Sequence, residues 1–296
     1  MNYYTEIKNE LINNEITKKV KDYSKNRSDL TTYYNVGKLL SEAGKHYGEG
    51  IIKEYSRRLK EDINLRYTKS SLYNMLKFYV FVEQNKFQTM SGKLSWSHYV
   101  ELLSMDNIDE IKYYIMITEQ QNLSVRQLRE KIKNNEYERL DDNAKVKLIN
   151  NIDYVISDFI KNPIIIKNTA NKEIISEKVL HRLILEDLDS FLKELGNSFS
   201  YIASEYKIKI GTSYNYIDLL LYNIEFNCYV VVELKVTELK KEHIGQIEVY
   251  MNYIDKNLRR VTQDKTIGIV ICKKDNKFIM EYCSDKRILA KEYKLI

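Results

Sequence analysis

Three ionisable residues interrupt two apolar stretches in the last third of the chain, and they could do chemistry there. Asp218 lies within the apolar stretch 217–221, and Glu233 and Lys235 lie within 230–235. An ionisable group in a buried strand is costly unless it is paired or bound to a metal ion. Because side chains alternate along a strand, Glu233 and Lys235 share one face. These residues are therefore the first candidates for a catalytic site.

A hairpin between the two stretches would set the two carboxylates against each other. If residues 223–227 form the connection, Asp218 lies opposite Glu233, with Cβ atoms about 4.5–5.5 Å apart. Opposed carboxylates repel each other, and carboxylates with a main-chain carbonyl and waters suit a hard cation such as Mg²⁺. Lys235 could then orient or deprotonate a water beside the ion. A slip of one residue in the register would remove this arrangement.

The elements that must position these residues are indicated by hydrophobic periodicity. A helical pattern over 173–195 ends at Gly196 and precedes strand-like patterns. The patterns that follow are strands at 199–210, 214–222 and 229–236, a helix at 242–255, a strand at 266–272 and a short ending at 278–295. This order predicts a mixed α/β domain over 173–296.

The first part of the chain predicts helices instead. Apolar residues recur at helical spacing through 1–140, and Thr68, Ser95 and Ser124 are typical helix N-caps. Residues 141–172 begin with a polar stretch that lacks apolar periodicity. We interpret 1–140 as an all-helical domain and 141–172 as a linker region.

The composition excludes several classes of protein. The 296 residues are 44% hydrophobic and 30% charged, which is typical of a chain with a sizeable core. A single proline and nine glycines exclude collagen-like and proline-rich chains. No stretch approaches the ~18 apolar residues that span a bilayer. We see no secretory signal, and three irregularly spaced cysteines fit neither a zinc site nor a disulfide framework. We therefore expect a cytoplasmic protein with no membrane partner.

The charge distribution leaves two interpretations open. The net charge is +5, and residues 53–77 carry seven basic side chains against three acidic ones. Such a run is either a solvated helix face or a contact surface for nucleic acid.

The residues around the ionisable cluster resemble the core of the PD-(D/E)xK nuclease superfamily. Asp218 and the string 233–235 match its catalytic positions, and Gln246 with Tyr250 resembles the QxxxY signature of RecB-like members. Longer strings at 191–196, 216–220, 232–235, 245–246 and 267–272 together resemble the YhcG-like family of bacterial nucleases. The string Leu-Ser-Trp-Ser-His-Tyr at 94–99 resembles that family's uncharacterised first domain. The resemblance spans roughly 20–296.

This resemblance implies a restriction-endonuclease-like domain with α-β-β-β-α-β order over 173–296. It follows a helix-turn-helix-like domain over 1–140 that binds nucleic acid or a partner, with a homodimer or larger complex as one outcome. The implied activity is hydrolysis of phosphodiester bonds with Mg²⁺ or Mn²⁺ as cofactor, and DNA is the expected substrate. Asp218, Glu233 and the Leu234 carbonyl would hold the ion, and Lys235 would position the attacking water. Gln246 and Tyr250 would anchor the nucleic-acid backbone or Lys235.

The sequence departs from the family pattern in two places. The proline of the superfamily name is Ile217, which leaves the metal chemistry untouched. The glycine-rich turn expected before Leu72 reads Asn-Leu-Arg-Tyr-Thr at 64–68, which weakens a DNA-contacting role there.

The superfamily also places a glutamate on the preceding helix. Glu177, Glu186 and Glu194 all lie in the helical stretch before the strands. Glu194 matches the family string best and is our prediction.

Two other functions stay open from the sequence. The chain could bind DNA or assemble a complex without cutting, although a binding module has no need for opposed carboxylates. It could also serve as a toxin-like or defence component. His98 beside Trp96 could be catalytic, but a packed histidine is the better interpretation because no acid partner is visible. The sequence contains no glycine-rich phosphate loop, so ATP dependence has no support.

Overall fold

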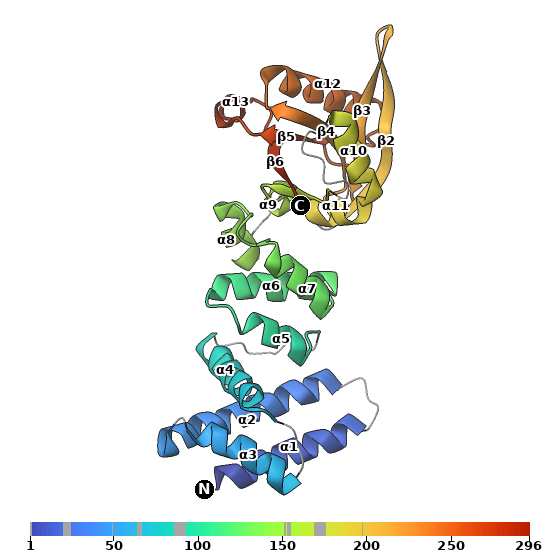
Figure 1. Ribbon diagram of the computed structural model, residues 1–296. Coiled ribbons are helices and arrows are strands. Elements are labelled where there is room, and N and C mark those ends of the chain that lie inside the picture. The colour runs from blue at the N-terminus through green and yellow to red at the C-terminus, as the bar shows by residue number, and fades with distance from the viewer. Residues whose placement is uncertain are drawn as a thin grey trace. The chain divides into compact units, whose positions relative to one another are not determined.

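The computed structural model describes residues 2–19, 25–48, 50–63, 67–85, 93–150, 152, 155–168, 176–196 and 198–296. The chain divides into two units, Met1–Asn134 and Asn135–Ile296 (Figure 1). We describe each unit by itself.

The first unit is helical, as the sequence predicts. Its helices are α1 (Tyr3–Lys19), α2 (Lys25–Tyr47), α3 (Ile51–Ile63), α4 (Lys69–Asn85), α5 (Trp96–Leu102), α6 (Ile108–Gln121) and α7 (Val125–Lys133). Buried side chains of α1 to α4 form a common core, which includes Ile7, Val36, Leu59 and Met75. Gly37 permits the close approach of α2 to α4, because a Cβ there would lie 2.2 Å from the Met75 carbonyl oxygen.

The side chains of Thr68 and Ser124 cap their helices as the sequence predicts, whereas Ser95 is an N-cap without such a bond. Thr68 and Ser124 accept hydrogen bonds from the main chain three residues later, at 3.1 and 3.3 Å. The Ser95 N–H donates instead to Nδ1 of His98 at 3.0 Å, and the other ring nitrogen lies 3.0 Å from the Leu123 carbonyl. His98 is therefore a packed structural histidine, as the sequence interpretation held, and burial lowers its pKa.

The second unit is built on a six-stranded mixed sheet with the order β1-β6-β5-β4-β3-β2. The strands are β1 (Ile164–Ile166), β2 (Phe199–Ile210), β3 (Ser213–Asn223), β4 (Cys228–Glu238), β5 (Ile267–Lys274) and β6 (Ile288–Leu295). Across the sheet, β1, β6, β5 and β4 are parallel to their neighbours in that order. β4, β3 and β2 form an antiparallel meander. β3 and β4 lie in the interior of the sheet, which explains their apolar sequences.

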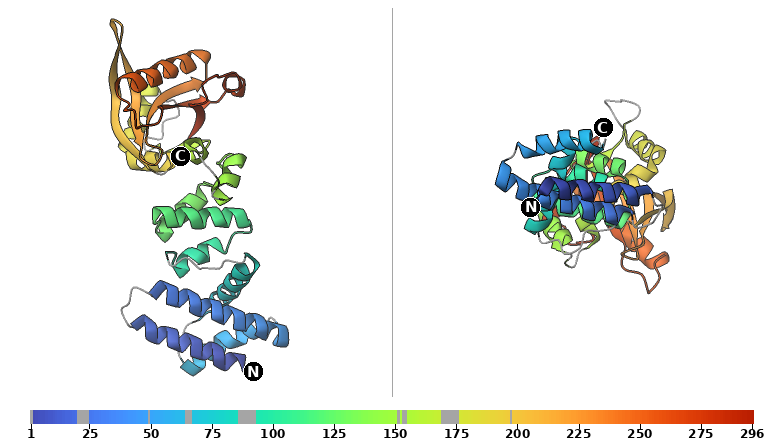
Figure 2. Two further views of the ribbon diagram at one scale, coloured as in Figure 1. Left: turned by 180° about the vertical axis from the view of Figure 1, so that it is seen from behind. Right: turned by 90° about the horizontal axis from the view of Figure 1, so that it is seen from below.

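Helices cover both faces of this sheet (Figures 1 and 2). The helices of the unit are α8 (Asp142–Asn150), α9 (Ile156–Phe159), α10 (Glu177–Glu186), α11 (Leu188–Leu195), α12 (Lys241–Asn257) and α13 (Lys277–Glu281). Residues of α10 and α11 pack on one face in a core with Leu219, Val232 and Ile271, and α12 packs on the other with Leu220 and Val231. Gly268 lets α12 lie close to β5, since a Cβ there would lie 2.5 Å from Sδ of Met251.

The stretch 141–172, interpreted as a linker from the sequence, contains regular structure. It carries α8, α9 and β1, and β1 pairs with β6 through Ile164 and Tyr293. Ile164 and Ile166 are buried in the same core as α10 and α11. The linker interpretation is wrong for these elements, because short apolar segments find their partners far along the chain.

The long helix predicted over 173–195 is divided. Residues 173–175 lie outside the described part, α10 begins after Ser176, and Asp187 ends it and caps α11. The short ending predicted over 278–295 contains most of α13 and the strand β6, which lies between β1 and β5 in the sheet.

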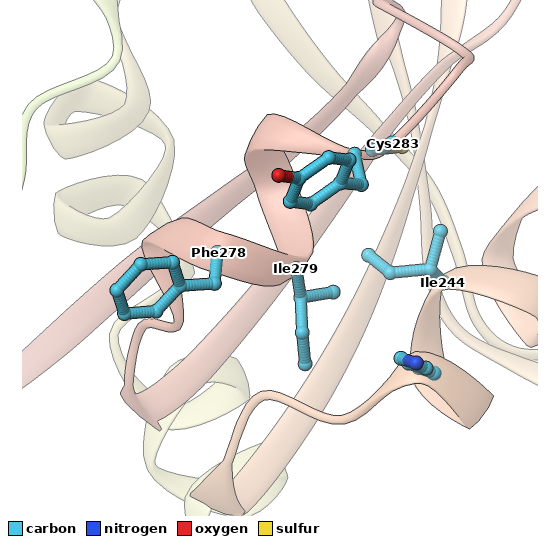
Figure 3. Close-up of a pocket in the computed structure, with 6 residues that line it drawn as sticks. Ile244, Phe278, Ile279 and Cys283 are labelled. Atoms are coloured by element: carbon cyan, nitrogen blue, oxygen red, sulfur yellow. The ribbon is translucent and has the colours of Figure 1, made fainter.

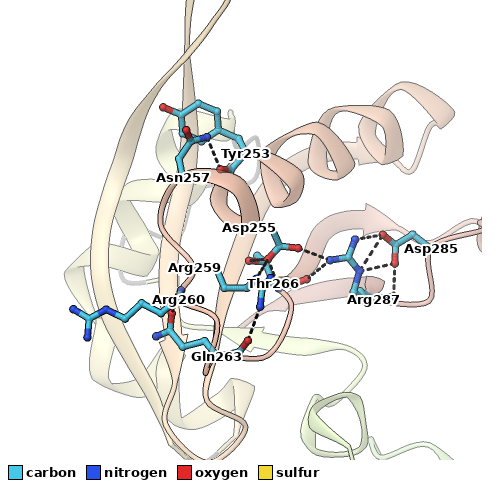
Figure 4. A network of polar contacts seen from close by, with 9 residues as sticks. All are labelled: Tyr253, Asp255, Asn257, Arg259, Arg260, Gln263, Thr266, Asp285 and Arg287. Atoms are coloured by element: carbon cyan, nitrogen blue, oxygen red, sulfur yellow. Dashed lines mark hydrogen bonds and ion pairs between the residues drawn. The ribbon is translucent and has the colours of Figure 1, made fainter.

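A polar network ties the end of α12 to the starts of β5 and β6 (Figure 4). Asp255 accepts hydrogen bonds from the N–H and hydroxyl of Thr266 at 2.8 and 2.7 Å. Arg287 donates to Asp255 at 2.9 Å and to both oxygens of Asp285. The guanidinium holds the pKa of Asp285 below its ordinary value.

Two further findings concern the described residues alone. None of their helices is long and apolar enough to cross a membrane. Cys228, Cys272 and Cys283 are free thiols, the first two of them buried.

Candidate active site

The hairpin register, continued by one residue past its last pair, sets Asp218 opposite Glu233, which agrees with the sequence spacing. Leu219 pairs with Val232, and the pairing continues to Asn223 with Cys228 around a turn at 224–227. The next residue along each strand is one of the two acids. The Leu234 N–H donates to Oδ2 of Asp218 at 2.8 Å, which fixes that carboxylate against β4.

Glu233 is the most deeply buried acid of the cluster. It is 2% exposed, and its Oε2 lies 3.4 Å from Nζ of Lys235. Its Oε1 is buried without a hydrogen-bond partner. Burial and the neighbouring Asp218 carboxylate raise the pKa of Glu233 to about 8, and burial also raises the pKa of Asp218. The pair is thus costly to ionise in the absence of a compensating cation.

Lys235 lies between carboxylates from two elements. Its Nζ is 3.4 Å from Glu233 on β4 and 3.9 Å from Oε2 of Glu177, the first residue of α10. The lysine is 9% exposed. Both acids hold its ammonium group close to Asp218.

The structure places Glu194, the predicted helix acid, beside Arg139 and β1 and not beside Lys235. It forms a buried ion pair with Arg139 and accepts the Ile165 N–H at 3.0 Å. Arg139 also donates to the Pro163 carbonyl at 2.7 Å. Glu194 therefore fastens α11 to the segment around β1. The helix is divided after Glu186, and Glu177 is the glutamate beside Lys235.

Two histidines at the cluster escaped the sequence interpretation. Nε2 of His181, four residues after Glu177 on α10, lies 3.1 Å from the Asp218 carbonyl oxygen. His243, near the start of α12, is buried, and burial followed by the charge of Lys235 lowers its pKa. The spacing of Glu177 and His181 on one helix face was the available signal for the first. Nothing local marks His243.

Gln246 and Tyr250 lie one turn apart on α12 and contact each other. The Gln246 amide donates to the Tyr250 hydroxyl at 3.0 Å, and Tyr250 is buried against the sheet. Their expected role toward nucleic acid or Lys235 stays a prediction.

A separate hollow of about 480 Å³ lies between the start of α12 and α13 (Figure 3). Its lining is largely apolar and comprises Lys241, Ile244, Phe278, Ile279, Tyr282 and Cys283. The catalytic candidates are not among these residues, so the hollow is distinct from the acidic cluster.

The donor set of the cluster fits a hard divalent cation that keeps water ligands. The unpartnered Oε1 of Glu233 is a buried acceptor that a cation would satisfy, and Asp218 lies opposite it. Among the described residues, no group of three or more histidine, cysteine, aspartate or glutamate side chains is arranged to hold a metal. An ion here would therefore complete its shell with main-chain oxygen and water, as Mg²⁺ commonly does.

The second unit, which carries the acid–acid–lysine cluster, is a nuclease domain of the PDDEXK class by its match to a family model. Residues 157–296 match the model of the YhcG PDDEXK nuclease domain, and residues 8–139 match that of the DUF1016 N-terminal domain. The chain thus carries a DUF1016 N-terminal domain followed by a YhcG PDDEXK nuclease domain. It is 27% identical to "Putative nuclease YhcG" of Escherichia coli (strain K12) over 89% of this chain and 82% of the relative.

Two solved structures show partial similarity to the chain. A repair endonuclease from Pyrococcus abyssi matches 42% of this chain at 18% identity and a TM-score of 0.29. An EndoMS–dsDNA complex matches 44% at 19% identity and a TM-score of 0.29. The chain spans about half the length of these two structures, 49% and 48%.

Proposed function

We propose that the protein is a metal-dependent nuclease that hydrolyses phosphodiester bonds in DNA, with Mg²⁺ or Mn²⁺ as cofactor. The observation that carries this proposal is the buried, unpartnered Glu233 oxygen, set opposite Asp218 and beside Lys235. Family membership supports the nuclease chemistry. The choice of DNA rests on the family resemblance and on the positive net charge.

Asp218, Glu233 and the Leu234 carbonyl would hold the ion. When bound, such an ion lowers the pKa of a coordinated water and stabilises negative charge on the phosphoryl oxygens. The Leu234 N–H orients the Asp218 carboxylate, and His181 contacts the main-chain carbonyl of the same residue. Both contacts keep Asp218 in place before the substrate arrives.

Lys235 would act directly on the reacting atoms. Glu233 and Glu177 hold its ammonium group, which can donate hydrogen bonds to the attacking water and to a phosphate oxygen. The water oxygen bonds to phosphorus as the bond to the oxygen of the leaving strand breaks, and that oxygen ends with the proton that the water gives up. A donor placed at this centre stabilises the charge that develops in the transition state.

We further propose that the helical unit contributes weak nucleic-acid binding or assembles copies of the chain. Within 53–77, Arg57 and Arg58 pair with acids of their own helix, which reduces the free charge. Lys53, Lys60, Lys69 and Lys77 are exposed on α3 and α4. Residues 64–66, part of the turn that departs from the family pattern, lie outside the described part.

Lys235→Ala tests the proposed chemistry. The variant should bind DNA with nearly unchanged affinity while cleavage falls by at least about a hundredfold, because the loss is confined to the transition state. Cleavage of labelled linear, single-stranded and branched DNA in Mg²⁺ and in Mn²⁺ measures the rate, and fluorescence anisotropy in Ca²⁺ measures affinity.

Asp218→Asn is the variant to compare with Lys235→Ala. It removes one of two repelling carboxylates and should therefore keep the fold. A protein that merely binds DNA would lose affinity in Lys235→Ala and have no cleavage to lose. Wild-type protein that cuts none of these DNA substrates with either ion would overturn the proposed function.

A further inference from the structure

The β2–β3 hairpin continues beyond the strands beside it as a two-stranded ribbon (Figures 1 and 2). β4 pairs with β3 from Asn223 to Leu219, whereas β2 and β3 remain paired out to Ile210 with Ser213. The part of the hairpin between Leu219 and the turn is therefore a two-stranded ribbon with two faces, and β4 does not pair with it. Asp218 lies at the base of this part.

The two faces of the ribbon differ in chemistry. Ile208 is 1% exposed and packs with Ile217 and residues of α12, so this face is buried. The cross-strand pairs Lys207 with Tyr216 and Lys209 with Tyr214 alternate with it and lie on the other face. Two lysines and two tyrosines therefore form a block, which we call the ribbon patch.

The ribbon patch is exposed and its charge is held in place. Tyr214 and Tyr216 are 56% and 53% exposed, which is unusual for aromatic side chains in a strand. Nζ of Lys207 lies 3.9 Å from the ring centroid of Tyr214, and Nζ of Lys209 lies 5.8 Å from it. These cation–π contacts concentrate positive charge on one aromatic surface.

We propose that the ribbon patch binds a single-stranded segment of the nucleic-acid substrate next to the scissile phosphate. Lysines beside exposed aromatic rings combine phosphate attraction with base stacking, which is how sequence-tolerant single-strand binding surfaces work. Tyr216 precedes Asp218 by two residues, a span of about 7 Å along a strand. A strand on the ribbon patch would thus lead to the acidic cluster. The inference rests on the proposed function, which supplies the scissile phosphate.

The test measures binding in an Asp218→Asn background, where the substrate stays intact. Fluorescence anisotropy follows single-stranded, tailed-duplex and blunt-duplex oligonucleotides, each as DNA and as RNA, between 50 and 200 mM salt. Lys207→Ala with Lys209→Ala should lower the salt dependence of single-strand affinity by about 1.4 in logarithmic slope, at about 0.7 per lost contact. Tyr216→Ala should weaken single-strand binding at least about fivefold, and Tyr216→Phe should restore it because stacking needs the ring alone.

A matched control removes two charges elsewhere. Lys256 in the last turn of α12 and Arg260 just after the helix are exposed, away from the start of α12 beside the cluster. Their double alanine variant should bind single strands as the background does. Equal losses in this control, unchanged binding in the ribbon variants, or equal losses for blunt duplex would each overturn the inference. Circular dichroism melting confirms that every variant is folded.

Cleavage with Asp218 intact separates the two proposals. If the protein cuts DNA but the ribbon variants bind and cut normally, the ribbon inference fails and the proposed function stands. If the ribbon variants lose single-strand binding while the wild-type protein cuts nothing, the proposed function fails and the ribbon patch remains a binding surface without a reaction beside it.

Discussion

At the scale of single residues, Asp218, Glu233 and Lys235 stand out because they break a local rule. Each of them places an ionisable group inside an apolar strand. The fold tolerates these groups because they meet in one cluster. His181 and His243 break no such rule. They join the cluster because α10 and α12 pack on opposite faces of the sheet, and that packing is a tertiary property.

Glu177 and Glu194 give a direct comparison between two glutamates of the same helical stretch. Glu177→Gln should lower cleavage at least about tenfold with little change in thermal stability, because Glu177 is half-exposed and holds Lys235. Glu194→Gln should instead destabilise the protein by about 3 kcal/mol, since the buried guanidinium of Arg139 would lose its carboxylate partner. Cleavage assays and thermal melts of both variants measure these effects. A reversal of the two phenotypes would restore Glu194 as the site acid.

At the scale of elements, the predictable part was the hairpin and its flanks. Alternation and continuous apolar runs indicate β2 to β5, and the loop length fixes the register of β3 on β4. β1 could not be recognised, because three isoleucines in a row do not distinguish a strand from a buried loop. Its strand identity depends on β6, which lies at the other end of the same unit's sequence.

The network around Arg287 predicts a pH-dependent stability. Arg287→Ala should cost about 2 kcal/mol at neutral pH, because Asp255 and Asp285 lose charged hydrogen bonds. The arginine depresses the pKa of Asp285 in the folded state, so its stabilisation is present above the ordinary aspartate pKa and is lost as pH falls through the depressed value.

Urea unfolding of wild type and Arg287→Ala from pH 7 down to pH 2 checks this dependence. The difference in unfolding free energy should shrink in acid. Arg287→Lys should recover part of the stability that Arg287→Ala loses at neutral pH. Lysine keeps the positive charge but lacks the planar, bidentate donors of the guanidinium. A difference that is constant with pH would show that the arginine acts through packing alone.

At the scale of the whole molecule, the boundary between the two units lies at Asn134 and Asn135, earlier than the start of the nuclease domain read from the sequence. The sequence could indicate two regions, one all-helical and one with mixed helices and strands. It could not show that α8, α9 and β1 complete the second unit, because tertiary contacts hold this segment there. These contacts are the ion pairs of Lys161 with Glu136 and of Arg139 with Glu194, and the pairing of β1 with β6.

Two fragments test this boundary. A fragment of residues 135–296 should unfold cooperatively, whereas one of residues 173–296 should be largely unfolded or aggregate. The shorter fragment lacks β1, which leaves the edge of β6 unpaired and removes the buried Ile164 and Ile166 from the core. Circular dichroism melts and size-exclusion chromatography measure both. A stable, monomeric 173–296 fragment would show that the earlier segment is dispensable.

The pairing of β1 with β6 also bears on the order in which the chain can fold during synthesis. The helical unit makes its contacts within the first part of the chain and can fold as soon as it leaves the ribosome. The sheet cannot close at β1 until residues 288–295 have been made, because β6 stands between β1 and β5. Such distant pairing is slow. A cell making this protein would therefore hold a folded first unit well before it holds a complete second unit.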